Sequence, residues 1–171
     1  MRRVGVITRR ISNSNYKESY SAISNNWLNF FNNLKIEPIL ITEKITKPIN
    51  YFETLNCSCL FLLNGEDTKL KVKNGKFKSG SDRDFVEFKL LQYCLKKKFP
   101  ILGICRGHQF INIYFEGKIK KINNHVNKNH KIKIIDQSIK EKLKLNDKSN
   151  VLVFGCEGDT DQEMYQKLIN Q

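Results

Sequence analysis

The sequence predicts an α/β fold, a three-layer sandwich in which a mostly parallel sheet carries helices on both faces. Short apolar runs recur along the chain, and each has the length and composition of a buried parallel strand. The runs are Val4–Thr8, Ile39–Ile41, Cys59–Leu63 and Ile101–Ile104. Longer segments between them place apolar residues every three or four positions, as amphipathic helices do. Strands that alternate with helices favour a parallel sheet.

Length and composition agree with a single domain. The chain has 171 residues, enough for one substantial core. Its net charge of +13 permits polyanion binding, but the lysines are spread along the chain and few aromatic residues are interleaved with arginines. We therefore expect no nucleic-acid partner.

No run approaches the roughly 18 apolar residues of a membrane span, and no apolar segment follows the basic N-terminus, so we expect a cytoplasmic protein without membrane association.

The first third of the chain predicts two strands around one helix. Val4–Thr8 is typical of a central parallel strand, and Ser12–Tyr20 of a polar connector. Apolar residues at helical spacing then predict an amphipathic helix over Tyr20–Leu34, with its stripe packed on the sheet. The Glu37-Pro38 pair is expected to stop this helix before the second buried strand, Ile39–Ile41.

The next segment predicts a connector, a strand and a loop. Ile45–Thr54 is a connector, with a short helix near Tyr51–Leu55. The third strand, Cys59–Leu63, ends in the loop Asn64–Thr68, where Gly65 permits the backbone to come close to a ligand. The alternative is a plain turn after the strand.

A lysine-rich excursion and a long helix follow. Leu70–Gly80 carries an Asn74-Gly75 pair, which is a hairpin signal. Ser81 is placed to cap a helix over Asp82–Lys98, which ends in three lysines that suit the helix dipole. The apolar positions expected to face the core are Phe85, Phe88, Leu91 and Leu95.

The segment Phe99–Phe115 organises the functional hypothesis. An apolar strand runs through a tight turn at Cys105 into a helix over Arg106–Phe115. Gly103 and Gly107 flank the cysteine, as a strained strand-to-helix turn requires when helix and strand pass close together. A cysteine at such a helix N-terminus is favoured as the thiolate, the nucleophilic form. The alternative is an ordinary buried cysteine that behaves as a small hydrophobe.

The other cysteines are expected to be reduced core residues. The five are Cys57, Cys59, Cys94, Cys105 and Cys156, an odd set in a chain without a secretory signal. Cys57 and Cys59 are separated by one residue, and no second pair completes a zinc site. We expect no metal and no cofactor.

At this point the residues carry a family resemblance. The sequence GICRGHQ, residues 103–109, resembles the nucleophile elbow of class I glutamine amidotransferases, and residues 81–102 resemble the γ-glutamyl hydrolase (peptidase C26) branch of that superfamily. The match covers much of residues 1–135. It implies a flavodoxin-like sheet with the site at the carboxyl ends of the strands, and a structural role for the Arg83-Asp84 pair.

The resemblance also implies a reaction. Cys105 attacks a γ-glutamyl carbonyl to form a thioester, and the oxyanion lies between the backbone N–H of Arg106 and that of Gly65 or Glu66. Asn64 to Asp67 is similar to the Gly-Gly-x-Asp loop of relatives, with one glycine replaced. Gln109, one turn into the helix, would line the glutamyl pocket.

The later part of the chain departs from the family pattern. Lys118–Ile122 and Lys131–Ile135 alternate lysine and isoleucine, as half-exposed strands do, and Ile139–Leu145 is a short helix or loop. Relatives carry a Trp-His-Pro-Glu segment late in the chain. Here Val151–Asp159 resembles that region, so Glu157 falls at the position of the catalytic acid. Gly155 stands where the family pattern has histidine. The three histidines of this chain are His108, His125 and His130.

Several functional hypotheses remain open from the sequence. The domain, 1–171, is taken as one glutamine amidotransferase-like unit with a shortened or degenerate C-terminal part. As a hydrolase, it would release glutamate from a small-molecule γ-glutamyl substrate; resemblance suggests a nucleotide-linked γ-glutamyl amidate used in capsule biosynthesis. The alternatives are a degenerate glutamine-pocket protein without turnover and a glutaminase subunit that feeds ammonia to a synthetase partner. A homo-oligomer is also compatible with these residues.

Overall fold

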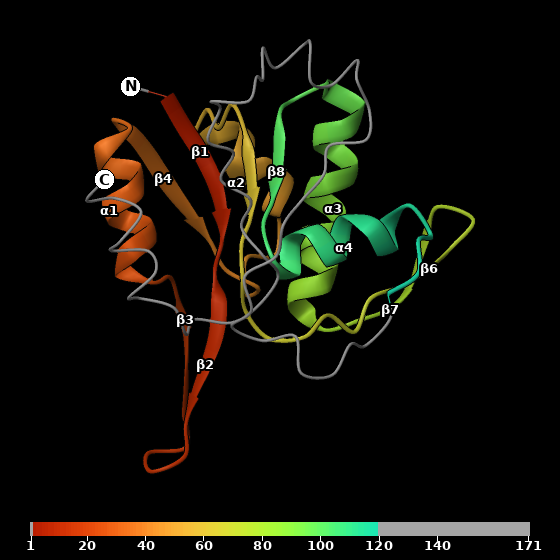
Figure 1. Cartoon of the computed structure of the whole chain (residues 1–171), viewed down its shortest axis with the longest axis horizontal. Helices are drawn as coiled ribbons and strands as arrows, with labels where there is room; N and C mark the ends of the chain where they lie inside the picture. The colour runs from red at the N-terminus through yellow and green to blue at the C-terminus, as the bar shows by residue number, and fades with distance from the viewer. Residues whose placement is uncertain (1, 120–171) are drawn as a thin grey trace, which may run out of the picture. The chain divides into compact units, whose positions relative to one another are not determined.

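In the part of the chain that the structure describes, a four-stranded parallel sheet lies between the helices (Figure 1). The computed structural model describes residues 2–119. Its strands are β1 (Arg2–Ile7), β4 (Ile36–Ile41), β5 (Leu60–Leu62) and β8 (Ile101–Gly103), in the order β4-β1-β5-β8. The predicted α/β architecture with a mostly parallel sheet is therefore confirmed, and β1 is central as expected. The expectations for residues 120–171, and with them a single domain over 1–171, lie beyond the described residues.

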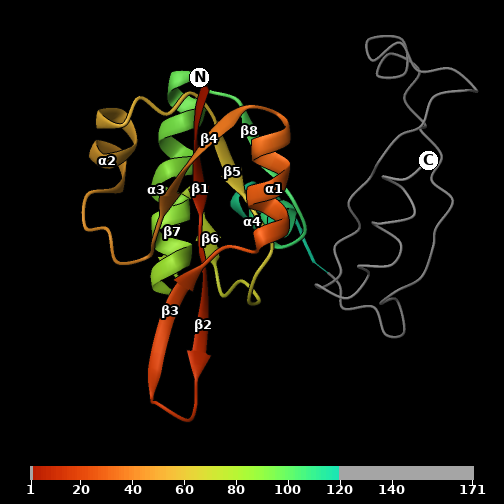
Figure 2. The same ribbon diagram turned by 90° about the vertical axis from the view of Figure 1, so that its left-hand side faces the viewer.

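Helices cover both faces of this sheet (Figure 2). Helix α1 (Asn25–Asn33) lies on one face, and α2 (Pro48–Thr54) and α3 (Asp82–Lys97) lie on the other. Because strand side chains alternate between faces, each strand feeds two separate cores. The sheet residues on the α1 side are Val4, Val6, Phe61 and Leu63; those on the α2 and α3 side are Ile7, Ile41, Leu60 and Leu62.

The segment after β1 corrects a prediction. The expected polar connector is an antiparallel hairpin of β2 (Arg9–Asn13) and β3 (Glu18–Ala22), so α1 begins at Asn25, where Ser24 caps it. The hairpin projects past the carboxyl end of β1, as both ribbon views show (Figures 1 and 2). The sequence concealed it because both strands are largely exposed and polar, and they therefore lack the apolar alternation of half-buried strands.

The end of α1 corrects another prediction. The helix ends at Asn33, before Lys35 adopts a positive φ of 54°, and Pro38 has no part in stopping it. Pro38 lies inside β4, opposite Val4. Among the described residues β4 is a terminal strand, where a missing N–H is tolerated. Leu34, expected in the apolar stripe, is exposed.

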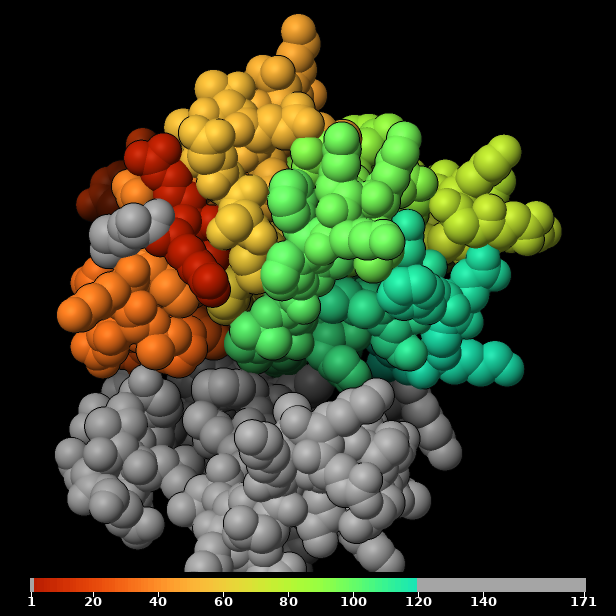
Figure 3. All heavy atoms as spheres, turned by 90° about the horizontal axis from the view of Figure 1, so that it is seen from above, coloured from red at the N-terminus to blue at the C-terminus, as the bar shows by residue number. Residues whose placement is uncertain are grey.

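Two other elements match their predictions closely. Strands β6 (Lys71–Lys73) and β7 (Lys76–Ser79) form the hairpin, with Asn74 and Gly75 at φ of 51° and 66° in its turn. In the space-filling view this hairpin lies beside α4, and the Gly75 amide donates to Glu116 at 3.0 Å (Figure 3). Helix α3 begins with a complete capping box between Ser81 and Asp84.

Some expected core positions are exposed instead. Phe85 and Leu95 of α3 lie outward, whereas Val86, Leu90 and Cys94 face the core. Leu102 is also exposed, so β8 is not the fully buried strand that its composition predicts. The reason is its place in the sheet, since β8 is a terminal strand of the part described. In that same part, no helix is long and apolar enough to cross a membrane.

Close packing at two glycines sets the turn from β8 into α4 (Arg106–Tyr114). A Cβ on Gly107 would lie 1.9 Å from the Leu62 carbonyl oxygen, and one on Gly103 would lie 2.5 Å from the Ile111 side chain. Real Cβ atoms do not come so close, so only glycine lets the helix lie against the neighbouring strands. The predicted reason for these glycines is confirmed.

Gly107→Ala is expected to destabilise the fold because the added methyl group would overlap the backbone carbonyl of Leu62, which cannot move aside as a flexible side chain could. Overpacking of this kind costs about 1–3 kcal/mol, and thermal melts should show a decrease of roughly 5 °C or more. Gly75→Asn is the control, because nothing lies within 4 Å of a Cβ there and asparagine tolerates a positive φ. Equal melting temperatures for Gly107→Ala and the wild type would contradict this packing.

Candidate active site

Cys105 occupies the sharp bend between β8 and α4. It is the N-cap residue of α4, with φ 53° and ψ −113°, and its side chain is half-buried. A positive φ is uncommon for a residue with a side chain, and such strain concentrates at functional sites. The thiol is thereby placed at the positive end of the α4 dipole, which favours a thiolate.

The loop after β5 leaves the sheet next to Cys105. Leu62 pairs with Gly103 across the two parallel strands, and the Ile104 amide donates to the Leu62 carbonyl at 2.9 Å. The chain then passes from β5 into Asn64 and from β8 into Cys105 at the same edge. The indole N–H of Trp27 donates to the Asn64 side-chain oxygen at 3.1 Å, so α1 also holds this loop.

Arg83 of α3 fills the space beside the loop glycine. A Cβ on Gly65 would lie 2.0 Å from Nη1 of Arg83 and 3.1 Å from the Cβ of Arg9. The close approach at Gly65 is therefore made by a guanidinium of the same chain. Glu66, the next residue, accepts from Nη1 of Arg83 at 2.8 Å. Arg83 of α3 therefore contacts both loop residues, the backbone of Gly65 and the carboxylate of Glu66.

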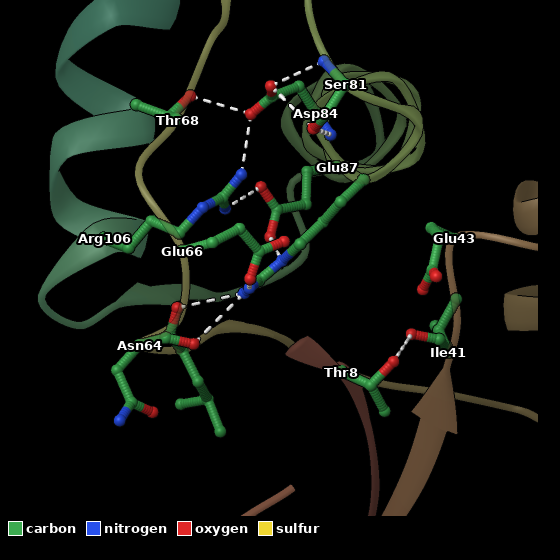
Figure 4. Close-up of polar contacts among 12 residues, drawn as sticks. Thr8, Ile41, Glu43, Asn64, Glu66, Thr68, Ser81, Asp84, Glu87 and Arg106 are labelled. Carbon is green, nitrogen blue, oxygen red and sulfur yellow. Dashed lines mark hydrogen bonds and ion pairs between the residues drawn. The ribbon is translucent and has the colours of Figure 1, made fainter. Parts of the chain in front are cut away.

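The Arg106 side chain turns away from solvent into a buried ion network (Figure 4). It is 2% exposed, and Nη2 donates to Asp84 at 2.6 Å while Nη1 donates to Glu87. Its Nε is a buried side-chain nitrogen without a hydrogen-bond partner within residues 2–119. The sequence assigned a role to the backbone N–H of Arg106, and the structure adds an anchored side chain.

Glu87 joins the two arginines. One carboxylate oxygen accepts from Nε of Arg83 at 2.9 Å, and the other accepts from Arg106. The Glu87 carboxylate is fully buried and was missed by sequence reasoning. A signal existed, because Glu87 lies one turn after Arg83 and between the apolar residues Val86 and Phe88 of α3.

Asp84 is the most heavily bonded carboxylate of the network. It accepts from the hydroxyls of Thr68 and Ser81 and from the amides of Lys69 and Ser81. Burial alone would raise its pKa, but these hydrogen bonds and the charge of Arg106 outweigh it and hold the pKa of Asp84 below its ordinary value. The carboxylate is therefore charged in the folded protein at neutral pH.

The other described cysteines are poor nucleophiles. Burial raises the pKa of Cys57 to about 11 and that of Cys94 to about 12, and burial also raises the pKa of Cys59. A raised pKa leaves little thiolate at neutral pH. Cys57 and Cys59 both precede β5, and they lie on opposite sides of the sheet, since Cys57 belongs to the core on the α2 and α3 side and Cys59 packs against the core on the α1 side.

The remaining candidates divide into placed and unplaced residues. The Gln109 amide donates to the Cys105 carbonyl at 3.1 Å, which puts Gln109 one turn into α4 with a half-buried side chain. His108 is exposed. Glu157, His125 and His130 lie outside the described residues. Within the described part, no cluster of three or more metal-ligating side chains occurs.

Comparison with known families identifies this arrangement. A model of the peptidase C26 family matches residues 4–162, most of the chain. The chain belongs to the peptidase C26 family. The elbow at Cys105 and the loop at Gly65 both lie within the matched region.

Individual relatives agree with this C26 membership. The chain is 30% identical over 128 residues to gamma-glutamyl-CDP-amidate hydrolase of Campylobacter jejuni, which covers 73% of this chain and 61% of that protein. The chain thus spans less than two thirds of that relative. A segment of 37 residues is 54% identical to a provisionally named glutamine amidotransferase of Schizosaccharomyces pombe, covering 22% of this chain and 15% of that protein. Another segment, of 43 residues, is 46% identical to a provisionally named glutamine amidotransferase-like protein of Rickettsia prowazekii. It covers 25% of this chain and 15% of that protein.

Iodoacetamide at neutral pH is expected to alkylate Cys105 before the other four cysteines. The α4 N-terminus favours its thiolate, whereas burial raises the pKa of the described alternatives. Peptide mass spectrometry over a time course measures each site separately. Equal rates at all five cysteines would contradict the elbow.

Acid is expected to destabilise the folded chain through Asp84. Its pKa is lower in the folded than in the unfolded state, so its stabilising effect is complete above the unfolded pKa and is lost as pH falls through the folded pKa. Melting temperatures of wild type and Asp84→Asn should therefore differ most at neutral pH and converge below about pH 4. A constant difference across this range would show that the Asp84 charge contributes nothing to stability.

Proposed function

We propose that this chain hydrolyses a γ-glutamyl amide through a thioester on Cys105. The observation that carries the proposal is the backbone of Cys105, a positive-φ bend between a strand and the N-terminus of a helix, in a chain of the C26 family. A strained elbow of this kind presents a nucleophile at the top of a parallel sheet. The relative from Campylobacter jejuni is named as a hydrolase of a γ-glutamyl compound, which supports the same reaction class here.

The proposed reaction has two steps. The Cys105 thiolate adds to the γ-carbonyl carbon, the C–N bond then breaks, and the amine leaves with a proton while the thioester forms. Water next adds to the thioester, the C–S bond breaks, and glutamate and the free thiol are released. Each tetrahedral intermediate carries an oxyanion, and backbone N–H donors at such a position are worth about 3 kcal/mol each.

Each candidate residue has a role in this proposal. The amide of Arg106 and that of Gly65 or Glu66 donate to the oxyanion, since the two loops leave adjacent strands. At the first residue of a helix the amide has no acceptor within the helix, which leaves the Arg106 N–H for a substrate. Gln109 lines the glutamyl pocket, and Glu157 takes the place of the acid in the family pattern.

The proposed substrate is a small γ-glutamyl amidate linked to a nucleotide, as in capsule biosynthesis. The printed name of the Campylobacter jejuni relative supports this choice. The net charge of +13 also suits an anionic substrate. We place the reaction in the cytoplasm, where reduced thiols persist.

A second candidate function is capture of a γ-glutamyl group without turnover. One sequence feature favours it, because Gly155 stands where the family pattern has histidine. Without a group that returns the proton, the thioester would form slowly or accumulate.

The test is a hydrolysis screen with glutamine, a γ-glutamyl anilide and a nucleotide-linked γ-glutamyl amidate. Glutamate release is expected from the wild type and from Cys59→Ala, and none from Cys105→Ala, because Cys105 is the one cysteine of residues 2–119 that lies at a helix N-terminus. Ammonia release only in the presence of a synthetase would favour a glutaminase subunit. Selective labelling of Cys105 without any glutamate release would favour the non-turnover candidate and contradict a hydrolase.

A further inference from the structure

We propose that Arg83 and Glu87 position the two peptide groups that bind the oxyanion. This inference rests on the proposed function, because it concerns the oxyanion donors assigned there to Arg106 and to Gly65 or Glu66, and it selects Gly65 as the second donor. In this proposal neither Arg83 nor Glu87 touches the reacting atoms. Arg83 acts through the loop after β5 and Glu87 acts through Arg106 at the elbow, so both are positioning residues.

Arg83 holds the loop by its carbonyls. Its Nη2 donates to the carbonyl of Leu63 at 3.2 Å and to that of Asn64 at 3.3 Å. The guanidinium is itself buried, with 2% of the side chain exposed, so these carbonyls accept from a charge that water does not screen.

The hold on the Asn64 carbonyl fixes the direction of the next amide. All described peptide bonds are trans, and in a trans peptide the C=O and the N–H point in opposite directions. The Asn64 carbonyl faces Arg83, so the N–H of Gly65, which belongs to the same peptide group, faces away from Arg83. That is the orientation an oxyanion donor needs, because an N–H turned toward a guanidinium could not meet an anion.

Glu87 ties the second donor to the same frame. Its two carboxylate oxygens accept from Arg83 and from Arg106, whose own backbone begins α4 directly after Cys105. Asp84 holds the other end of the Arg106 guanidinium. One turn of α3 therefore holds the loop after β5 and the elbow at Cys105 relative to each other. A displacement of either segment would shift the other, because both are bonded to Glu87 through an arginine.

The energetics favour a positioning role over a purely stabilising one. A buried ion pair is often no more stabilising than apolar side chains of the same volume, because the charges lose their hydration. Here a buried donor, Nε of Arg106, has no partner in the described part of the chain, which adds a further cost. Apolar side chains could not turn the Asn64 carbonyl, whereas the Arg83 fork does.

The experiment compares Arg83→Lys with the wild type in two reactions of Cys105. Lysine keeps the charge but loses the fork that reaches Glu87 and both carbonyls. The first reaction is alkylation by iodoacetamide, which needs the thiolate and no oxyanion donor. The second uses a glutamine analogue with a nitrile in place of the side-chain amide: the thiol adds across C≡N, a C–S bond forms, and the nitrogen takes the proton and the oxyanion position.

The expected result is a split between the two reactions. Arg83→Lys should form the nitrile adduct more slowly, on the order of 10²-fold, as when one oxyanion donor is lost, with the rate of alkylation unchanged. Arg3→Gln is the matched control, because Arg3 pairs with Glu37 at 2.9 Å near the amino end of β1. Equal effects on both reactions, or none on either, would overturn the inference.

A measurement on the wild type covers the case in which Arg83→Lys does not fold. In a ¹⁵N-labelled chain, the Gly65 and Arg106 amide protons should move downfield when the nitrile adduct forms, because each gains a hydrogen-bond acceptor, the nitrogen of the adduct. A Gly65 amide that does not respond would overturn the inference. Adduct formation does not require turnover, so a wild type that hydrolyses nothing but shows the Arg83-dependent split would end the hydrolase proposal and support the positioning role.

Discussion

One buried carboxylate, Glu87, is shared by two buried arginines, and the geometry around Cys105 depends on it. Two positive groups, Arg83 and Arg106, face Glu87, Asp84 and the partly exposed Glu66. Loss of one partner from such a set leaves an uncompensated charge in the interior, which costs about 3–5 kcal/mol. The three parts of the chain that meet here are the loop after β5, the first two turns of α3 and the elbow before α4. The pairing of β5 with β8 brings the loop next to the elbow, and the network joins both of them to α3.

This unit also explains how a strained residue persists. A positive φ at Cys105 costs of order 1–3 kcal/mol, and the surrounding structure must hold it in place. On one side, Gly103 and Gly107 let α4 pack closely against the neighbouring strands. On the other, the Arg106 side chain is anchored to α3, which prevents the first turn of the helix from relaxing outward. Steric contact at the glycines and the buried ion pairs of Arg106 thus both restrict the backbone of Cys105 and Arg106.

Sequence patterns predicted the sheet and the elbow for a physical reason. Buried parallel strands and close-packed glycines are local features, so VGVIT, CLFLL and the glycines around Cys105 carry their own signal. The hairpin β2–β3 lacks such a signal because its strands are exposed and bond mainly to each other. Glu87 was missed for a different reason, because a charged residue on a helix is expected on the solvent-exposed face. Its burial is compensated by tertiary contacts with two arginines, which the local sequence does not reveal.

Charge at the site and charge of the whole chain have separate physical roles. The whole chain carries +13, yet the network beside Cys105 contains more carboxyl groups, three, than guanidinium groups, two. The excess positive charge therefore lies elsewhere, and a share of it is on exposed lysines such as those of the hairpin β6–β7. Exposed charges are screened by salt and act on the approach of an anionic ligand, whereas the buried network is little screened. Salt should thus affect encounter more than the geometry of the loop and elbow amides, because those amides are held by contacts that water does not reach.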